Sequence, residues 1–208
     1  MRKLFLTVLA LLPAPVFAVD GVVLINQSAL TAAGGTYTIT QPGSYKLSGN
    51  LVAPAGKQAI VIAANSVTLD LSGFSVTCSL TQPTSNFSCI GNPFLTGVAD
   101  VILQNGFVSI SVAVASLGGT IVNFNDSVNV TIEGVHVRMN SPAQGGFVGL
   151  AVGTGSIIRH NIVPANSSFN GGLNTHCPSL VEGNVTGGIL LFGSGCVAIA
   201  NIGDITVF

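Results

Sequence analysis

Charged side chains are scarce in this sequence. Asp, Glu, Lys and Arg make up 6% of its 208 residues, against about a quarter in an average soluble domain. Because the formal net charge is −1, the chain lacks the extended basic surface that nucleic-acid binding uses. Its polarity comes instead from amides and hydroxyls, since Asn, Ser, Thr and Gly interrupt the apolar residues throughout.

Long hydrophobic runs are also missing beyond the N-terminus, and none reaches the roughly 20 residues that span a bilayer. At the start, a basic pair and the apolar stretch LFLTVLALL (4–12) are followed by prolines and by VFA (16–18). This pattern predicts a secretory signal at residues 1–18, cleaved after Ala18, and no membrane anchor. We therefore expect an exported protein: secreted, periplasmic or on the cell surface.

Only four cysteines are present, and export would allow them to form disulfides. Cys78 and Cys89 bracket a polar, proline-containing stretch that is typical of a surface loop, so we expect them to be paired. Cys177 and Cys196 lie about one repeat apart, and they either bridge neighbouring repeats or pack as small hydrophobic residues in the core. His176 precedes Cys177 without a second such pair, so no metal site is predicted.

Helical periodicity is absent as well. The chain instead repeats a short apolar alternation, then Asn or Gly, then a second apolar segment, in 65–77, 99–110, 127–139, 155–163, 178–186 and 195–208. Alternation with period two predicts strands, here three to five residues long. Repeats that run in one direction, joined by bends and not by helices, predict a coil in which each strand pairs in parallel with its equivalent one turn later.

Two stretches carry a family resemblance. TQPGSYKLSGNL (40–51) and AIVIAANSVTLDLSGFSVT (59–77) resemble the first coils of right-handed parallel β-helix repeat proteins, the pectin-lyase-like superfamily, and the resemblance extends over about residues 36–208. It implies an all-β fold: a single-stranded right-handed parallel β-helix, or solenoid. The superfamily includes lyases, hydrolases, epimerases, adhesins and tailspikes, so the resemblance does not select an activity.

The β-helix domain is expected over residues 19–208. Residues 19–40 are less periodic and form an N-terminal cap region, and 41–208 form the coils. The alternation of NIGDITVF (201–208) runs to Phe208, so we expect an uncapped C-terminal coil that is covered by another chain, by another copy, or by sequence of a longer protein of which this chain is a fragment.

Stacked coils place equivalent side chains above one another in columns. We expect two inward columns, one formed by Leu69, Val130, Ile158 and Val181, the other by Phe74, Phe107, Val135, Ile162, Val185 and Ile202. We also expect an asparagine ladder along one bend, made by Asn105, Asn161, Asn184 and Asn201, whose amides bond to one another and to the turn backbone.

A third column is charged. Glu133, Arg159 and Glu182 share one outward offset in consecutive repeats, with Gln104 before them and Ala200 after them. One interpretation is a surface ion-pair ladder that holds the register. The other follows the resemblance, because the lyases of the superfamily carry an arginine beside calcium-binding acids on an outer face.

A second polar cluster is a candidate for gripping a sugar acid; its members are Asp126, His136, Arg138 and His160. His136 and Arg138 alternate with valines, so both point outward on one strand. The alternative is an ordinary solvated face. Aromatic platforms for sugars are scarce, because the chain has no Trp and only two Tyr.

These features favour an exported non-catalytic β-helix protein, a surface or periplasmic scaffold that binds extended glycans or a protein partner along one face. The alternative is a polysaccharide lyase or epimerase acting on acidic polysaccharide, with Arg159 or Arg138 beside nearby acids. We expect no cofactor, with calcium needed only under that alternative.

Overall fold

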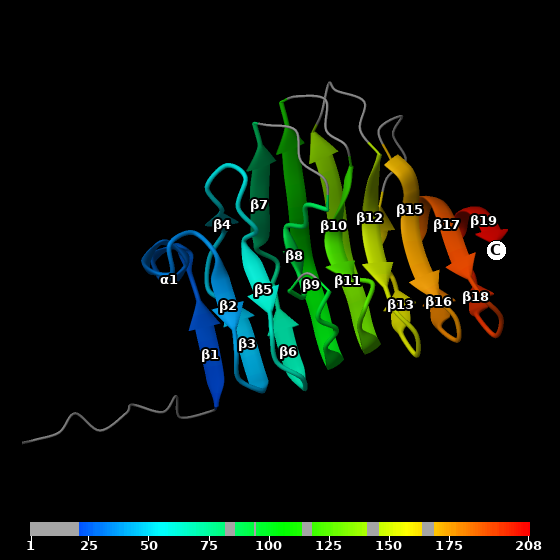
Figure 1. Ribbon diagram of the computed structural model, residues 1–208, viewed down its shortest axis with the longest axis horizontal. Helices are drawn as coiled ribbons and strands as arrows, with labels where there is room; N and C mark the ends of the chain where they lie inside the picture. Colours follow the sequence, from blue (N-terminus) through cyan, green and yellow to red (C-terminus); the bar gives the residue numbers. More distant parts are fainter. Residues whose placement is uncertain (1–20, 82–85, 94, 114–117, 141–145, 164–168) are drawn as a thin grey trace, which may run out of the picture.

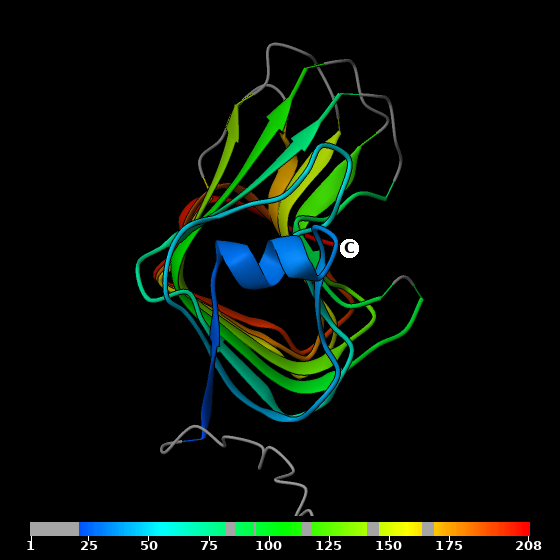
Figure 2. The ribbon, with the colours of Figure 1, turned by 90° about the vertical axis from the view of Figure 1, so that its left-hand side faces the viewer.

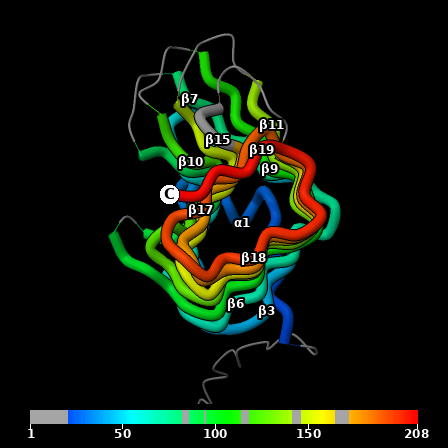
Figure 3. Tube along the Cα trace, turned by 90° about the vertical axis from the view of Figure 1, so that its right-hand side faces the viewer, coloured from blue at the N-terminus to red at the C-terminus, as the bar shows by residue number. Residues whose placement is uncertain are grey.

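The computed structural model describes residues 21–81, 86–93, 95–113, 118–140, 146–163 and 169–208 (Figure 1). In this part of the chain nineteen strands pair in parallel, and one short helix accompanies them. Figure 3, viewed from the end that carries Phe208, shows successive turns stacked around a common interior. The prediction of an all-β parallel solenoid from the repeats is confirmed. The predicted signal peptide (1–18) lies outside the described residues.

The parallel pairing divides each turn into three faces. The first face holds β1 (Val22–Ile25), β3 (Gly43–Leu47), β6 (Val67–Asp70), the first halves of β9 (Ala99–Val112) and β11 (Val128–Asn140), β13 (Ile157–Arg159), β16 (Leu180–Glu182) and β18 (Val197–Ile199). The second face holds β4 (Leu51–Val52), β7 (Ser75–Leu80), the second halves of β9 and β11, β14 (Ile162–Val163) and the starts of β17 (Val185–Phe192) and β19 (Ile202–Val207). The third face holds β2 (Tyr37–Ile39), β5 (Ile60–Ile62), β8 (Ile90–Gly91), β10 (Gly119–Phe124), β12 (Phe147–Val152), β15 (Phe169–His176) and the ends of β17 and β19.

Two strands are much longer than the predicted three to five residues. β9 has 14 residues and β11 has 13, because each continues through the bend between the first and second faces. The bend is made by one residue with positive φ, Asn105 at 60° in β9 and Gly134 at 62° in β11. A single left-handed residue turns the chain without ending the pairing on either side.

The first face contributes a fully buried inward column; its members are Leu69, Leu103, Ile132, Ile158 and Val181. The prediction that Val130 belongs to this column is wrong. Val130 pairs with Val101 and lies in the adjacent inward column. Alternation makes both Val130 and Ile132 inward, so only the pairing register decides which of them stacks on Ile158.

The other predicted inward column is also corrected. The residues that pair across the second face are Phe107, His136, Ile162, Val185 and Ile202, without Phe74 and Val135. This column points outward, and Ile202 is 67% exposed. The left-handed bend residue shifts the alternation by one position, so that the second residue after it faces solvent while the first, such as Val135, is buried.

The helix α1 (Gln27–Ala32) was not predicted. The Asn26 side chain caps it by accepting a hydrogen bond from the Ala29 N–H at 2.9 Å. Figure 2 shows α1 lying across the open end of the first turn. Leu30 is fully buried, so α1 places an apolar side chain over the end of the core within the predicted cap region.

Both cysteine pairs form disulfides. Cys78 on β7 is bonded to Cys89 beside β8, as predicted. Cys177 is bonded to Cys196. Of the two alternatives left open by the sequence, a bridge or two free thiols packed in the core, the structure therefore has the bridge. Two disulfides are consistent with an oxidising compartment.

The last described turn, β18 and β19, pairs on one side with β16 and β17. Its apolar side chains are exposed, among them Val197, Ile199, Ile205, Val207 and Phe208. Within the described residues no helix is long and apolar enough to cross a membrane.

Candidate functional site

The asparagines at the bend build a hydrogen-bonded stack along the axis. Nδ2 of Asn161 donates to Oδ1 of Asn184 at 3.1 Å, and Nδ2 of Asn184 donates to Oδ1 of Asn201 at 3.0 Å. Each of the two amides also donates to a main-chain carbonyl one turn earlier, that of Ile132 or Ile158, at 2.9 Å. Asn161 and Asn184 are fully buried, so these side chains are occupied by the fold and not offered to a ligand.

Asn105 is not part of this stack, contrary to the prediction. It occupies the left-handed position itself, and its amide donates to Asp70 at 3.4 Å on the exposed side. Asn161, Asn184 and Asn201 instead sit one residue after the left-handed position, where side chains point inward. Asn is favoured at either position, because it tolerates positive φ and also satisfies turn backbone, so its residue type does not distinguish them.

The charged column forms on the outer side of the first face. Its described members, in pairing order, are Lys46, Asp70, Gln104, Glu133, Arg159 and Glu182. The sequence located the last four and missed Lys46 and Asp70. The residue after Glu182 is Ile199 and not Ala200, because Ala200 has positive φ and forms the bend.

Arg159 is committed to an ion pair. Its Nη2 lies 2.8 Å from Oε2 of Glu133, and both side chains are between a third and a half exposed. The hydrogen bond and the charge of Glu133, with a weaker contribution from Glu182, raise the pKa of Arg159 above its usual value. His160 Nδ1 lies 3.9 Å from the other carboxylate oxygen. Arg159 therefore neutralises Glu133, as an ion-pair ladder requires, and leaves that carboxylate a poor metal ligand.

Arg138 has a different environment on the outer side of the second face. Its guanidinium carbon lies 5.8 Å from the centre of the Phe107 ring. The His136 ring belongs to the residue that pairs with Phe107, two positions before Arg138 on β11, and it lies 5.1 Å from the same Phe107 ring with its plane tilted by 60°. Among the described residues no carboxylate lies within ion-pairing distance of Arg138. We call Phe107, His136 and Arg138 the cationic platform.

Asp126 and His160 do not belong to this platform, so the predicted four-residue cluster is corrected. Asp126 lies in the turn before β11, at the opposite end of that strand from Arg138. His160 occupies the left-handed position of its bend, with φ of 56°, and faces Glu133. The length of β11 separates Asp126 from Arg138, and His160 lies in the bend before the second face.

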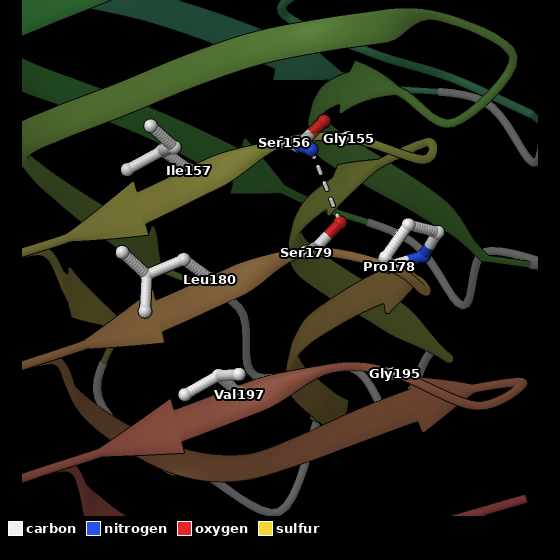
Figure 4. A pocket seen from close by; sticks show the side chains of 8 residues that line it. All are labelled: Gly155, Ser156, Ile157, Pro178, Ser179, Leu180, Gly195 and Val197. Atoms are coloured by element: carbon white, nitrogen blue, oxygen red, sulfur yellow. Dashed lines mark hydrogen bonds between the residues drawn. The ribbon is translucent and has the colours of Figure 1, made fainter.

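An apolar groove crosses the last three turns of the first face (Figure 4). Its volume is about 440 Å³, and Ile157, Leu180 and Val197 project along it from β13, β16 and β18. At its edge the Ser156 N–H donates to Ser179 Oγ at 3.1 Å. No sequence motif marks this groove, because each of its apolar residues alone occupies an ordinary outward position of a strand.

A polar cleft lies on the outer side of the third face and was also missed. It has a volume of about 300 Å³, and its polar lining includes Asn92, Thr120, Asn123, Asp126 and Asn174. Asn92 follows β8, while Thr120 and Asn123 lie on β10. Its residues come from separate turns, so no motif in the sequence marks it. Among the described residues, no group of three His, Cys, Asp or Glu side chains could hold a metal ion.

Fold and outer surface together define a disulfide-bonded parallel β-solenoid with an ion-pair ladder, a cationic platform and two clefts on its outside. Comparisons with protein-family models, with curated proteins and with solved structures each found no match to this chain. The function is therefore inferred from the surface itself.

Proposed function

We propose that this chain is an exported, non-catalytic right-handed parallel β-helix protein that binds extended acidic glycans along its outer surface. The cationic platform carries this proposal. The resemblance of residues 40–51 and 59–77 to pectin-lyase-like proteins supports the right-handed β-helix. The two disulfides support a periplasmic, secreted or cell-surface location.

Arg138 supports binding of a carboxylated sugar because its charge is not neutralised within the described chain. An arginine presents a planar fork of donors that matches a carboxylate. Phe107 beneath it holds the guanidinium over an aromatic face, and the His136 imidazole adds a polar edge beside the ring. The Ser109 and Thr77 side chains continue the same column as Arg138 and share a hydrogen bond at 3.0 Å, so the surface beside the arginine is lined by hydroxyls.

The alternative is a lyase or epimerase that removes a proton beside a uronate carboxylate. Such chemistry needs a base near the sugar and a calcium ion or other cation to stabilise the carboxylate. Glu133 and Glu182 flank Arg159 in the column, and the Arg159 side chain bonds to Glu133. This pairing favours a structural role for the ladder over a catalytic one.

The test measures binding and turnover on the same preparation. The secreted chain is titrated with oligogalacturonate, oligoalginate and a neutral glucan, and release of unsaturated uronates is followed by ultraviolet absorbance. We expect binding to an acidic oligosaccharide that weakens with salt, no product release, and an affinity loss of about tenfold in Arg138→Ala.

Arg159→Ala is the matched control, because it removes an arginine that is already paired. It is expected to bind acidic oligosaccharide as the unmodified chain does. If the unmodified chain releases unsaturated product and Arg138→Ala or Arg159→Ala abolishes this release, the lyase alternative is established. If the chain binds none of the glycans, the proposal is refuted.

A further inference from the structure

We infer that the polar cleft is a second, separate carbohydrate site, one that takes a single neutral sugar ring. This inference rests on the proposed function, because the proposal and the inference both assign glycan binding to the solenoid. The cleft, however, lies on the third face and would bind a neutral sugar, whereas the cationic platform would bind an acidic one. Two residues that line the cleft, Asn92 and Asn174, each have a buried polar atom without a hydrogen-bond partner.

Asn92 is the first such residue. It is 8% exposed, and its Nδ2 donates to the carbonyls of Pro93 at 3.1 Å and Thr96 at 2.8 Å. These two bonds fix the orientation of the amide, because a flipped amide would place its oxygen against two carbonyl oxygens. Oδ1 of Asn92 is buried and has no hydrogen-bond partner.

Asn174 on β15 has a second buried Oδ1 without a partner. An unpaired buried acceptor costs about 1–3 kcal/mol, so each of these two acceptors, in residues that line one cleft, calls for a donor. Hydroxyl groups of a ligand supply the missing donors. The cleft therefore fits a polyhydroxylated molecule.

The shape of the cleft follows from one column of the third face. Gly91, Asn123, Ala151 and Asn174 are paired in successive turns. The small Ala151 lies between two asparagines, so the column has a notch flanked by amides. Oδ1 of Asn123 accepts the Asn125 N–H at 3.1 Å, so the Nδ2 of this cleft-lining amide is left as a donor beside the two acceptors.

Charge selects among sugars. Among the described residues that line the cleft, Asp126 is the one ionisable side chain, so there a uronate or a phosphate would meet a carboxylate with no cation beside it. A volume of about 300 Å³ stands at the lower end of small-molecule sites. It suits one ring, such as the end of a neutral glycan. A calcium ion alone needs six to eight oxygens at about 2.3–2.6 Å, a cage much tighter than this cleft.

The test uses the full secreted chain and defined probes. Saturation-transfer NMR and calorimetry are run with glucose, galactose, mannose and N-acetylglucosamine, with galacturonate, and with calcium chloride alone. We expect at least one neutral sugar to bind, and neither galacturonate nor calcium to bind in this cleft.

Asn174→Ala is the decisive variant, since Oδ1 of Asn174 has no hydrogen-bond partner in the structure and the loss of the side chain should leave the fold intact. Removing one acceptor is expected to weaken the neutral sugar about tenfold. Asn140→Ala, an exposed asparagine at the end of β11, is the matched control and should bind the neutral sugar normally. Asp126→Asn should keep the neutral sugar and admit galacturonate.

The inference is overturned if no neutral sugar binds, if Asn174→Ala binds as tightly as the unmodified chain, or if calcium alone occupies the cleft. These outcomes do not affect the platform, because binding of acidic oligosaccharide that depends on Arg138 is measured separately. Conversely, a neutral sugar lost in Asn174→Ala supports the cleft even where no acidic glycan binds.

Discussion

Substituting Asn184 by alanine tests the interior stack most directly. Asn184 is fully buried. Its Nδ2 donates to the Ile158 carbonyl at 2.9 Å, and its Oδ1 accepts the Asn161 N–H at 2.9 Å. Alanine leaves both main-chain groups without these partners in the interior. At about 1–3 kcal/mol for each unsatisfied buried group, the variant should lose about 2–6 kcal/mol of unfolding free energy.

The assay is urea unfolding followed by far-ultraviolet circular dichroism, with amide hydrogen exchange to locate the effect. Each turn of a solenoid contacts its neighbours, so the exchange of amides in β13 and β16 should rise more than that of β3 and β6. Asn105→Gly is the matched control. Asn105 lies outside the stack with φ of 60°, a conformation that glycine adopts freely, so this change should stay within about 0.5 kcal/mol.

A loss below about 1 kcal/mol in Asn184→Ala, or a loss equal to that of Asn105→Gly, would refute the stack as a source of stability. Uniform acceleration of exchange over all turns would instead contradict local coupling along the axis.

Three further outcomes are expected. Cys177→Ser opens the bridge to Cys196 across 19 residues and should lower the unfolding free energy by about 3 kcal/mol in urea titrations; an unchanged midpoint would argue that the bridge constrains nothing. Burial, with a smaller contribution from Tyr37, raises the pKa of Tyr45 above its usual value of 10.0. The protonated Tyr45 therefore contributes its full stability to the fold below pH 10, and this contribution is lost as the pH rises through the raised pKa of the folded state. Above about pH 10 the Tm of the Tyr45→Phe variant should fall less steeply with pH than that of the unmodified protein. An equal fall in the variant and the unmodified protein would exclude Tyr45 as its source. Arg159→Ala should lower the urea midpoint at low salt and leave it unchanged in 1 M salt, because salt screens an exposed ion pair. A decrease that persists in 1 M salt would indicate that Arg159 acts through packing.

The repeat pattern alone predicted the parallel solenoid, because two-residue alternation without helical segments allows few other arrangements. The polar, proline-containing stretch between Cys78 and Cys89 predicted their pairing. The repeat also aligned Glu133, Arg159 and Glu182 in one outward column. These residues lie in strands just before the bend, where alternation is uninterrupted and counting positions gives the correct register.

Errors arose after the bend. A left-handed residue at Asn105, Gly134 or His160 shifts the inward–outward alternation by one position. At His160 the residue type gives no indication of a positive φ. For that reason four residues that face solvent in the column of His136 were assigned to the interior: Phe107, Ile162, Val185 and Ile202. Asn105 was placed in the stack for the same reason. Helix α1 was missed because six residues are too few to show a helical period.

What the sequence determined by itself was the local periodicity: short alternating segments separated by bends, which dictate strands, their common direction and the coil. What the tertiary structure decided was which residues of different turns meet. Arg138 acquires Phe107 beneath it, and Asn92 joins Asn174 at one cleft, only through pairing between turns. The physical reason is that a strand's alternation fixes the side of the sheet each residue faces, while the neighbour it meets depends on the register with another turn, which no local pattern encodes.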